Sequence, residues 1–185
     1  LFIFFVKIKP SGAIKVLKNG VITQEYSTIQ EAINHADQGS EILVSKGTYN
    51  EHLIVNKTVS IIGEDRGTTI IDGGGVTGPI VQVSANYVNV SGFTIQNSEP
   101  HSYGLYTDSS SYCTFSEIIA TNNGRGIYLR MCTRITVKDN LVTNNHFGIS
   151  IVESGSNILR NNSLQANLYN LDVSGESFMH YIQDI

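Results

Sequence analysis

The chain has no tryptophan, and its 185 residues include only two cysteines, two methionines and three prolines. Charged residues make up 15% of the sequence, whereas a typical soluble domain carries about a quarter. With a net charge of −4 and no basic run, the sequence lacks the electrostatic signature of a nucleic-acid-binding protein. The apolar run LFIFFV at 1–6 is too short to span a bilayer, so we expect no membrane insertion.

The two cysteines occupy different positions relative to the glycines that precede them. Cys113 follows Gly104 by 9 residues, and Cys132 follows Gly126 by 6. Stacked repeats would not place such residues face to face, so two unpaired thiols are favoured over a disulfide. Neither cysteine has CxxC or metal-ligand spacing.

Charged residues are few, and serine, threonine, asparagine and glycine are abundant instead. This composition favours short strands and turns. We assign 1–26 to an N-terminal segment. LFIFFVKIKP, at its start, fits either the remnant of a signal peptide, which would imply export, or a first strand. IKVLKNGVI (14–22) predicts a β-hairpin with Asn19-Gly20 as its turn.

Residues 27–40 predict an amphipathic helix. A capping box fits its start in two ways, over 27–30 or over 28–31. We expect this helix to plug one open end of the structure that follows, because terminal units of a repeat need a polar outer face. Its apolar stripe comprises Ile29, Ala32, Ile33 and Ala36.

A sequence repeat organises the second half of the chain. NNGRGIYL (122–129) recurs in register as NNHFGISI (144–151), so one period is the step from Asn122 to Asn144. A period of roughly 20–50 residues indicates a solenoid, in which each repeat buries its apolar face only against its neighbours. This length suits one coil of three short strands and three turns, with successive coils about 4.8 Å apart. The sequence therefore predicts an all-β parallel β-helix.

We assign 41–185 to this β-helix, expect about six rungs between residues 41 and 173, and expect it to continue beyond the C-terminus. The step from Val90 to Phe115 is three positions longer than one period, so we place three extra residues in SEPHSY (98–103), as a surface insertion. The predicted interior columns are Val90, Phe115, Val137 and Leu159; Ile95, Ala120, Val142 and Leu164; Leu105, Ile127, Ile149 and Leu171; and Thr107, Leu129, Ile151 and Val173.

Asparagines also recur in columns. Asparagine tolerates the left-handed conformation of tight turns, and stacked amides can hydrogen-bond along a ladder. We therefore interpret these residues as structural. The columns are Asn97, Asn122 and Asn144; Asn123, Asn145 and Asn167; and Asn140 and Asn162.

One outward-facing set is a candidate binding surface. Tyr106 and Tyr128 should stack on adjacent rungs and form a sugar platform, next to Asp108 and Arg130. The insertion, which carries His101, should lie beside this face. The alternative is ordinary cross-strand aromatic packing beside a surface salt bridge.

Glu117 and Asp139 form the other candidate site. They are one period apart in the sequence and should lie about 5 Å from each other on adjacent rungs. Two such carboxylates could serve a retaining glycosidase or provide two of the oxygen ligands of a calcium ion. The alternative is a solvated turn. Apart from calcium, the sequence implies no cofactor.

Taken together, these residues resemble the right-handed parallel β-helix superfamily of pectin-lyase-like proteins. The segment STIQEAINHADQGSEILVSKGTYNEHLIVNKTVSIIGEDRGTTIIDGGG (27–75) resembles the entry segment of pectin methylesterases and many surface β-helix proteins. The second half is similar to the NosD-type cell-surface and periplasmic repeats, and NLDVSGESFMHYIQDI (170–185) to the end of that repeat block. The resemblance implies a right-handed, single-stranded β-helix over 27–185.

The catalytic motifs of this superfamily are absent. Neither the acid motif and tryptophan-containing motif of pectin methylesterases nor the Asp-Asp and Gly-His-Gly motifs of polygalacturonase-like enzymes occurs. The first hypothesis is therefore a non-catalytic exported module, extracellular, at the cell surface or periplasmic, that binds carbohydrate or acts as a stalk. The alternatives are a fragment of a polysaccharide-active enzyme and a NosD-like accessory in copper delivery.

Overall fold

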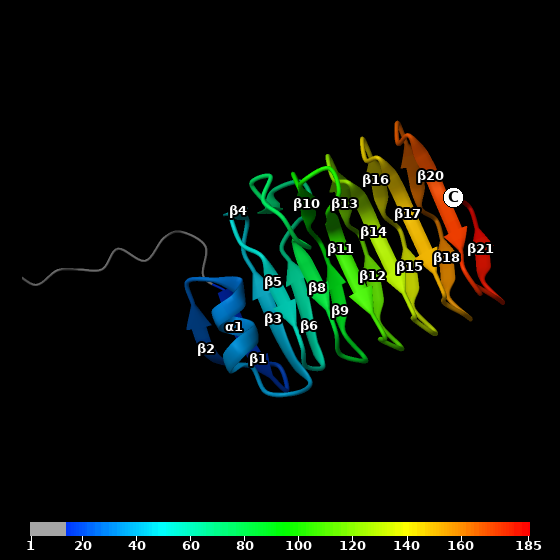
Figure 1. Ribbon diagram of the computed structural model, residues 1–185. Coiled ribbons are helices and arrows are strands. Elements are labelled where there is room, and N and C mark those ends of the chain that lie inside the picture. Colours follow the sequence, from blue (N-terminus) through cyan, green and yellow to red (C-terminus); the bar gives the residue numbers. More distant parts are fainter. Residues whose placement is uncertain (1–13) are drawn as a thin grey trace, which may run out of the picture.

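The computed structural model describes residues 14–185, which form an elongated solenoid with a hairpin and a helix at its N-terminal end (Figure 1). Successive strands pass from one sheet to the next, so each turn of the chain contributes one strand to each of three sheets. Two of these sheets have six strands each, which gives six complete turns. The prediction of a parallel β-helix with about six rungs is confirmed. The interpretation of LFIFFVKIKP lies outside the described residues.

The three sheets run along the solenoid axis, and all pairs are parallel except those made by β1. Sheet A contains, in spatial order, β2 (Val21–Tyr26), β1 (Ile14–Lys18), β3 (Ser40–Val44), β6 (Val59–Gly63), β9 (Asn89–Ser91), β12 (Thr114–Ser116), β15 (Thr136–Lys138), β18 (Ile158–Arg160) and β21 (Tyr181–Gln183). Sheet B contains β4 (Gly47–Tyr49), β7 (Thr69–Asp72), β10 (Thr94–Gln96), β13 (Ile119–Thr121), β16 (Leu141–Thr143) and β19 (Ser163–Gln165). Sheet C contains β5 (Leu53–Val55), β8 (Val81–Val83), β11 (Tyr103–Asp108), β14 (Arg125–Arg130), β17 (Phe147–Val152) and β20 (Tyr169–Ser174).

A hairpin and a short helix close the N-terminal end. β1 pairs antiparallel with β2 and with β3, and Asn19 and Gly20 make the turn with φ of 52° and 75°. The helix α1 (Ile29–His35) is shorter than the predicted 27–40, because Ala36 is already extended with ψ of 138°. The described chain holds no helix long and apolar enough to cross a membrane.

The solenoid itself holds both ends of α1. Thr28 Oγ1 accepts from Glu31 N at 3.2 Å, which is half of one of the two capping boxes considered. The carboxylate of Glu51 accepts from the first two helical amides at 3.0 and 2.9 Å. Lys57 Nζ donates to two carbonyls at the C-terminal end, at 2.9 and 3.0 Å. These contacts satisfy backbone groups that a helix cannot pair internally.

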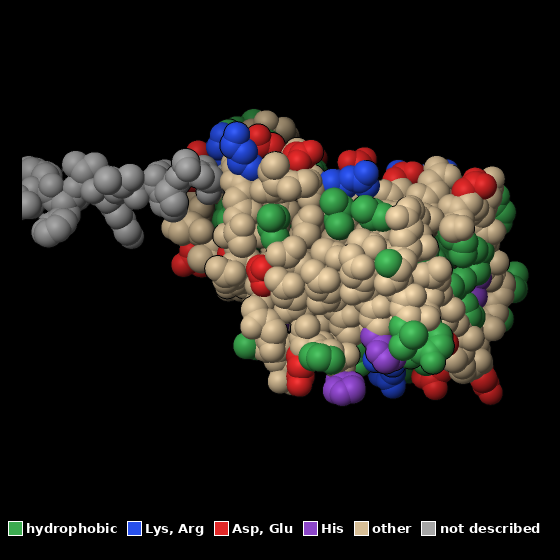
Figure 2. Space-filling model, turned by 90° about the horizontal axis from the view of Figure 1, so that it is seen from above, with side chains coloured by type: hydrophobic (Ala, Val, Ile, Leu, Met, Phe, Trp, Pro, Cys, Tyr) green, Lys and Arg blue, Asp and Glu red, His purple; other side chains and the backbone are tan. Residues whose placement is uncertain are grey.

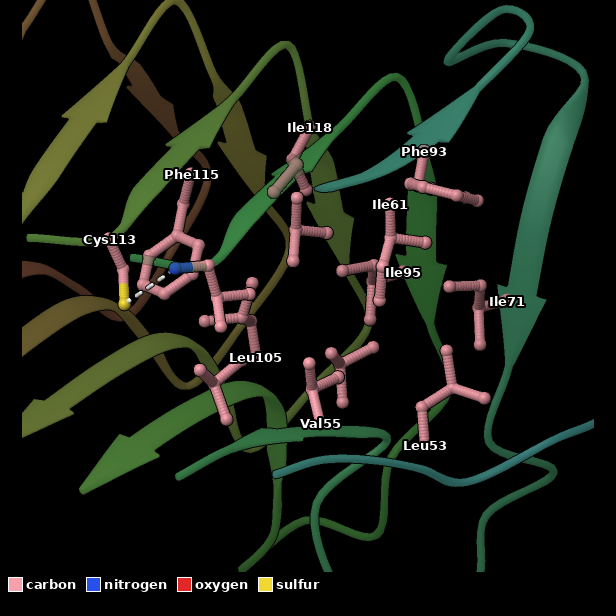
Figure 3. Packing of buried hydrophobic residues seen from close by; sticks show 14 of the residues in the cluster. Leu53, Val55, Ile61, Ile71, Phe93, Ile95, Leu105, Cys113, Phe115 and Ile118 are labelled. Carbon is pink, nitrogen blue, oxygen red and sulfur yellow. Dashed lines mark hydrogen bonds between the residues drawn. The ribbon is translucent and has the colours of Figure 1, made fainter. Parts of the chain in front are cut away.

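Apolar side chains fill the interior in columns (Figure 3). Strand pairing confirms the four predicted columns, including the pairs Phe115–Val137 and Ile127–Ile149. Because each rung supplies one side chain to each column, burial is complete only where a rung lies on both sides. Val173 is 44% exposed, contrary to its predicted interior role, because β20 is the edge strand of sheet C.

The turns use the left-handed conformation repeatedly. Asn97, Asn122 and Asn144 have φ between 55° and 65° at the first position of the turn from sheet B to sheet C. Asparagine tolerates this conformation better than most residues. No described contact links the side chains of these three residues into a ladder, so their shared role is to turn the backbone.

The second asparagine column forms a hydrogen-bonded ladder. Asn123 N donates to Asn145 Oδ1 at 2.9 Å, and Asn145 N donates to Asn167 Oδ1 at 3.0 Å. The side-chain amides donate in turn to carbonyls of the preceding rung, as Asn145 Nδ2 does to Ala120 O at 2.9 Å. Asn123 and Asn145 are buried, so these bonds satisfy backbone groups that water cannot reach.

A second ladder lies at the turn from sheet A to sheet B. Asn140 Oδ1 accepts from Ile118 N at 2.9 Å, and Asn162 Oδ1 accepts from Asn140 N at 3.2 Å. A third such residue was not predicted from the sequence. Asn157, fully buried after sheet C, accepts from Ile135 N at 2.8 Å. No asparagine lies one period before or after it, so periodicity could not reveal it.

The repeat motif now has a steric explanation. In NNGRGIYL the first asparagine turns the chain, the second joins the ladder, and the isoleucine enters the core. A Cβ on Gly126 would lie 2.8 Å from Gly148 O and 3.0 Å from Asn145 Nδ2. Glycine is therefore required where the ladder approaches the backbone of the next rung.

Both cysteines are free and buried, as the sequence favoured. The Sγ atom of Cys113 accepts from Val88 N at 3.5 Å (Figure 3). Burial raises the pKa of the Cys113 thiol to about 11 and also raises the pKa of Cys132. Both thiols therefore behave as small core side chains.

We predict that Asn145→Ala lowers the free energy of unfolding by about 2–4 kcal/mol, because it leaves Asn123 N buried without a partner and removes the side-chain hydrogen bond to Ala120 O. Asn144→Gly is the matched control. Asn144 is exposed with φ of 57°, which glycine also adopts, so we expect a change within about 0.5 kcal/mol. Urea denaturation measures both. Equal effects of the two substitutions would contradict the ladder.

Candidate functional site

The outer face of sheet C carries aromatic side chains in register. The strands of sheet C pair in register, so corresponding positions form columns along the sheet. In β11 and β14 the first, fourth and sixth positions are partly exposed and the other three are buried, so the outward columns come from these positions. We call this surface the aromatic face. Its first column is Tyr103, Arg125, Phe147 and Tyr169, its second is Gln82, Tyr106, Tyr128, Ser150 and Asp172, and its third is Asp108, Arg130, Val152 and Ser174.

Three tyrosines form the centre of the aromatic face. The ring centroids of Tyr106 and Tyr128 are 5.6 Å apart with an interplanar angle of 14°. Tyr103 lies 5.0 Å from each of them, tilted 30° and 19°. Such separations correspond to offset stacking, so neighbouring rings cover each other only in part. All three side chains are partly exposed.

Arg125 lies among these rings. Its Cζ is 5.7 Å from the centroid of Tyr103, 5.4 Å from that of Tyr128 and 4.8 Å from that of Phe147. These distances fit cation–π contact. The stack continues with Tyr169, whose ring is 5.0 Å from Phe147. The aromatic column therefore extends from β11 to β20 with one cation within it.

Tyr106 is linked to the charged pair at the edge of the aromatic face. Its hydroxyl donates to Asp108 Oδ2 at 3.0 Å, and Arg130 Nη1 donates to the same oxygen at 3.0 Å. Burial, followed by the hydrogen bond to the Asp108 carboxylate, raises the pKa of Tyr106 to about 12. Burial also raises the pKa of Tyr128. The structure thus brings together four of the five residues that the sequence proposed for binding.

The fifth, His101, lies on the insertion before β11. The extra residues fall within 97–102, because Tyr103 already pairs with Arg125 in the sheet. Ser98 anchors the loop, since its backbone amide donates to Asn123 Oδ1 at 3.1 Å. His101 is exposed, and no hydrogen bond or ring contact within the described chain joins it to the aromatic face. Its role in binding stays a prediction.

Glu117 and Asp139 lie on successive left-handed turns and line one surface groove together with Arg66. Arg66 Nη1 donates to the backbone oxygen of Asp139 at 3.1 Å. The Asp139 carboxylate accepts from Asn161 Nδ2 at 3.2 Å and lies 3.5 Å from Lys138 Nζ. Within residues 14–185, no group of three or more His, Cys, Asp or Glu is arranged to hold a metal ion. The Glu117 side chain is exposed and that of Asp139 is partnered, and a catalytic or calcium-binding role for the pair stays a prediction.

Most of the first outward column was not predicted from the sequence. Arg125, Phe147 and Tyr169 follow one another at steps of one period, so the same periodicity that identified the core contained this signal. The residues differ in type, which hid the column. A second exposed stack, Tyr87 on Tyr112 at 4.9 Å, lies on the turns between sheets C and A, away from the aromatic face.

We predict that Asp108→Asn lowers the pKa of Tyr106 from about 12 toward its usual value, because the hydroxyl loses its anionic acceptor. Near-ultraviolet difference absorbance during an alkaline titration measures this pKa, and Tyr106→Phe identifies the transition. Since folding raises this pKa, the hydroxyl favours the folded state below pH about 10, and that contribution is lost as the pH rises toward 12. An unchanged transition in Asp108→Asn would contradict the assignment.

Figure 2 shows one face of the molecule, where charged side chains gather along two edges and the strip between them is mostly uncharged. Along one of these edges, histidine and hydrophobic side chains lie together. The charge of the outer surface therefore varies from place to place, although the apolar side chains of the interior recur in every rung.

Several solved structures with this fold carry the names of polysaccharide-active enzymes. A pectin methylesterase from Yersinia enterocolitica matches with a TM-score of 0.58 and 18% identity, over 75% of this chain and 56% of that one. A putative glycosyl hydrolase from Parabacteroides merdae matches with a TM-score of 0.56 and 11% identity, over 84% and 87%. The A-module of the mannuronan C-5 epimerase AlgE4 from Azotobacter vinelandii gives 0.53 and 14%, over 79% and 52%. At these identities the likeness shows the fold alone.

A sequence relative has a different kind of name. A cell surface glycoprotein from Methanothermus fervidus is 30% identical over 166 residues, which is 83% of this chain. The chain spans 27% of the length of that relative. The protein family described as the right-handed beta helix region matches this chain over residues 79–180, which is more than half of it. The strand register and the asparagine ladders of this chain are consistent with the match. The chain belongs to the right-handed β-helix family.

Proposed function

We propose that this chain is a non-catalytic glycan-binding module at the cell surface, and that the aromatic face of sheet C is its binding surface. The observation that carries the proposal is the stack of Tyr103, Tyr106 and Tyr128, held partly exposed on a regular sheet. Aromatic rings with adjacent hydrogen-bonding groups suit pyranose sugars, which have apolar C–H faces and hydroxyl edges.

Rigidity supports this role. Each tyrosine belongs to a strand paired on both sides, and the Asp108 carboxylate holds the Tyr106 hydroxyl at 3.0 Å. Side chains already fixed in the free protein lose little conformational entropy on binding. The similarity to a cell surface glycoprotein supports a surface location and, with it, export.

We predict that Tyr128→Ala weakens glycan binding by at least about tenfold, because it removes a ring that packs against both other tyrosines. A glycan array identifies the ligand, and calorimetry with that ligand measures the affinity. Tyr112→Ala is the matched control, since Tyr112 is also stacked and exposed but lies away from sheet C. Unchanged affinity in Tyr128→Ala, or an equal loss in both variants, would remove the aromatic face from the proposal.

The enzyme alternative makes a different prediction. If the chain is non-catalytic, incubation with pectins, alginates and glycosaminoglycans, with and without calcium, releases no product. Turnover that is lost in Glu117→Gln would establish catalysis at the Glu117–Asp139 groove. No observation favours copper delivery, because the histidines, cysteines and carboxylates of the described chain form no metal-binding group.

A further inference from the structure

The guanidinium of Arg125 differs from the other cation of the aromatic face. Arg130 is paired with Asp108 at 3.0 Å, whereas Arg125 has no ion pair and no side-chain hydrogen bond within the described chain. Its Nε is buried without a partner. Arg125 as a whole is half-buried, and its terminal nitrogens are less completely buried than Nε.

Three aromatic rings fix the position of this cation. The distances from Arg125 Cζ to the ring centroids of Tyr103, Tyr128 and Phe147 are 4.8–5.7 Å. The guanidinium and the aliphatic part of the side chain therefore pack against aromatic surface. A desolvated N–H without a partner is rare in folded proteins. The terminal fork has the geometry that binds a carboxylate or a sulfate through two parallel hydrogen bonds.

The surrounding charges leave this fork available. Asp108, on the paired strand β11, already accepts from both Tyr106 and Arg130. Asp172 belongs to the second outward column, two rungs further along than Tyr128. Because the whole chain has a net charge of −4, a general attraction for anions is excluded.

We propose that the glycan bound on the aromatic face is anionic and that Arg125 receives its carboxylate or sulfate group. This inference rests on the proposed function and adds the ligand class to it. A ring of the glycan contacts the tyrosines, and the acidic substituent reaches the guanidinium fork between them. Such binding weakens as the ionic strength rises, since part of it is Coulombic.

Two matched ligand pairs test the proposal by calorimetry. Oligogalacturonate and its methyl ester differ in the charge of the carboxyl group, and a sulfated galactan oligomer and its desulfated form differ in the sulfate. We expect the wild-type chain to prefer the anionic member of at least one pair by about tenfold. The pair that shows the preference distinguishes carboxylate from sulfate.

Arg125→Gln should abolish the preference while leaving affinity for the uncharged member within about threefold, because the tyrosine stack remains. Arg125→Lys should retain only part of it, since an ammonium group cannot form the planar fork. Arg160→Gln on sheet A is the matched control and should keep the preference. A purely structural role for Arg125 would lower affinity for both members equally, and this result would overturn the proposal.

Equal affinity of the wild-type chain for charged and uncharged members in both pairs would also overturn the anionic preference, and glycan binding would stand. If the chain binds no member of either pair and no glycan on the array, the proposed function fails, and the anionic preference fails with it.

Discussion

Backbone amides at the turns need hydrogen-bond partners that the strands cannot supply, and this requirement governs the structure. The turns between sheets B and C lie partly in the interior, where water cannot satisfy them. Asn145 bonds the backbone of the preceding rung through both its oxygen and its amide. A register slip of one residue would break these bonds and turn the core columns outward. The ladder and the core therefore enforce the same repeat length.

The same constraint explains what could be predicted from the sequence. Columns such as Leu105, Ile127 and Ile149 repeat one chemical type at one spacing, so the pattern indicated the fold and the register. The length of α1 could not be predicted, because contacts from Glu51 and Lys57, distant in sequence, hold its ends.

The candidate site was predictable only in part, for a related reason. Tyr106 and Tyr128 were found because the same residue type recurs one period apart. Arg125 was missed because the positions before and after it in its column are aromatic, and its environment depends on three rungs together. In a solenoid, the inward positions must all be filled by residues of similar type that can be buried, whereas the outward positions can differ from rung to rung. Function on this fold is therefore harder to read from periodicity than architecture is.

The asparagine ladder also has a direction. The amide of Ser98 is satisfied by Asn123, that of Asn123 by Asn145, and that of Asn145 by Asn167, so each of these three turns depends on the rung that follows it. A rung becomes complete only when its successor has docked, and loss of a rung leaves unpaired groups in the one before it. Substitution of one ladder asparagine therefore acts on the rung before it, and the insertion at 97–102 is held by Asn123 of the rung that follows it.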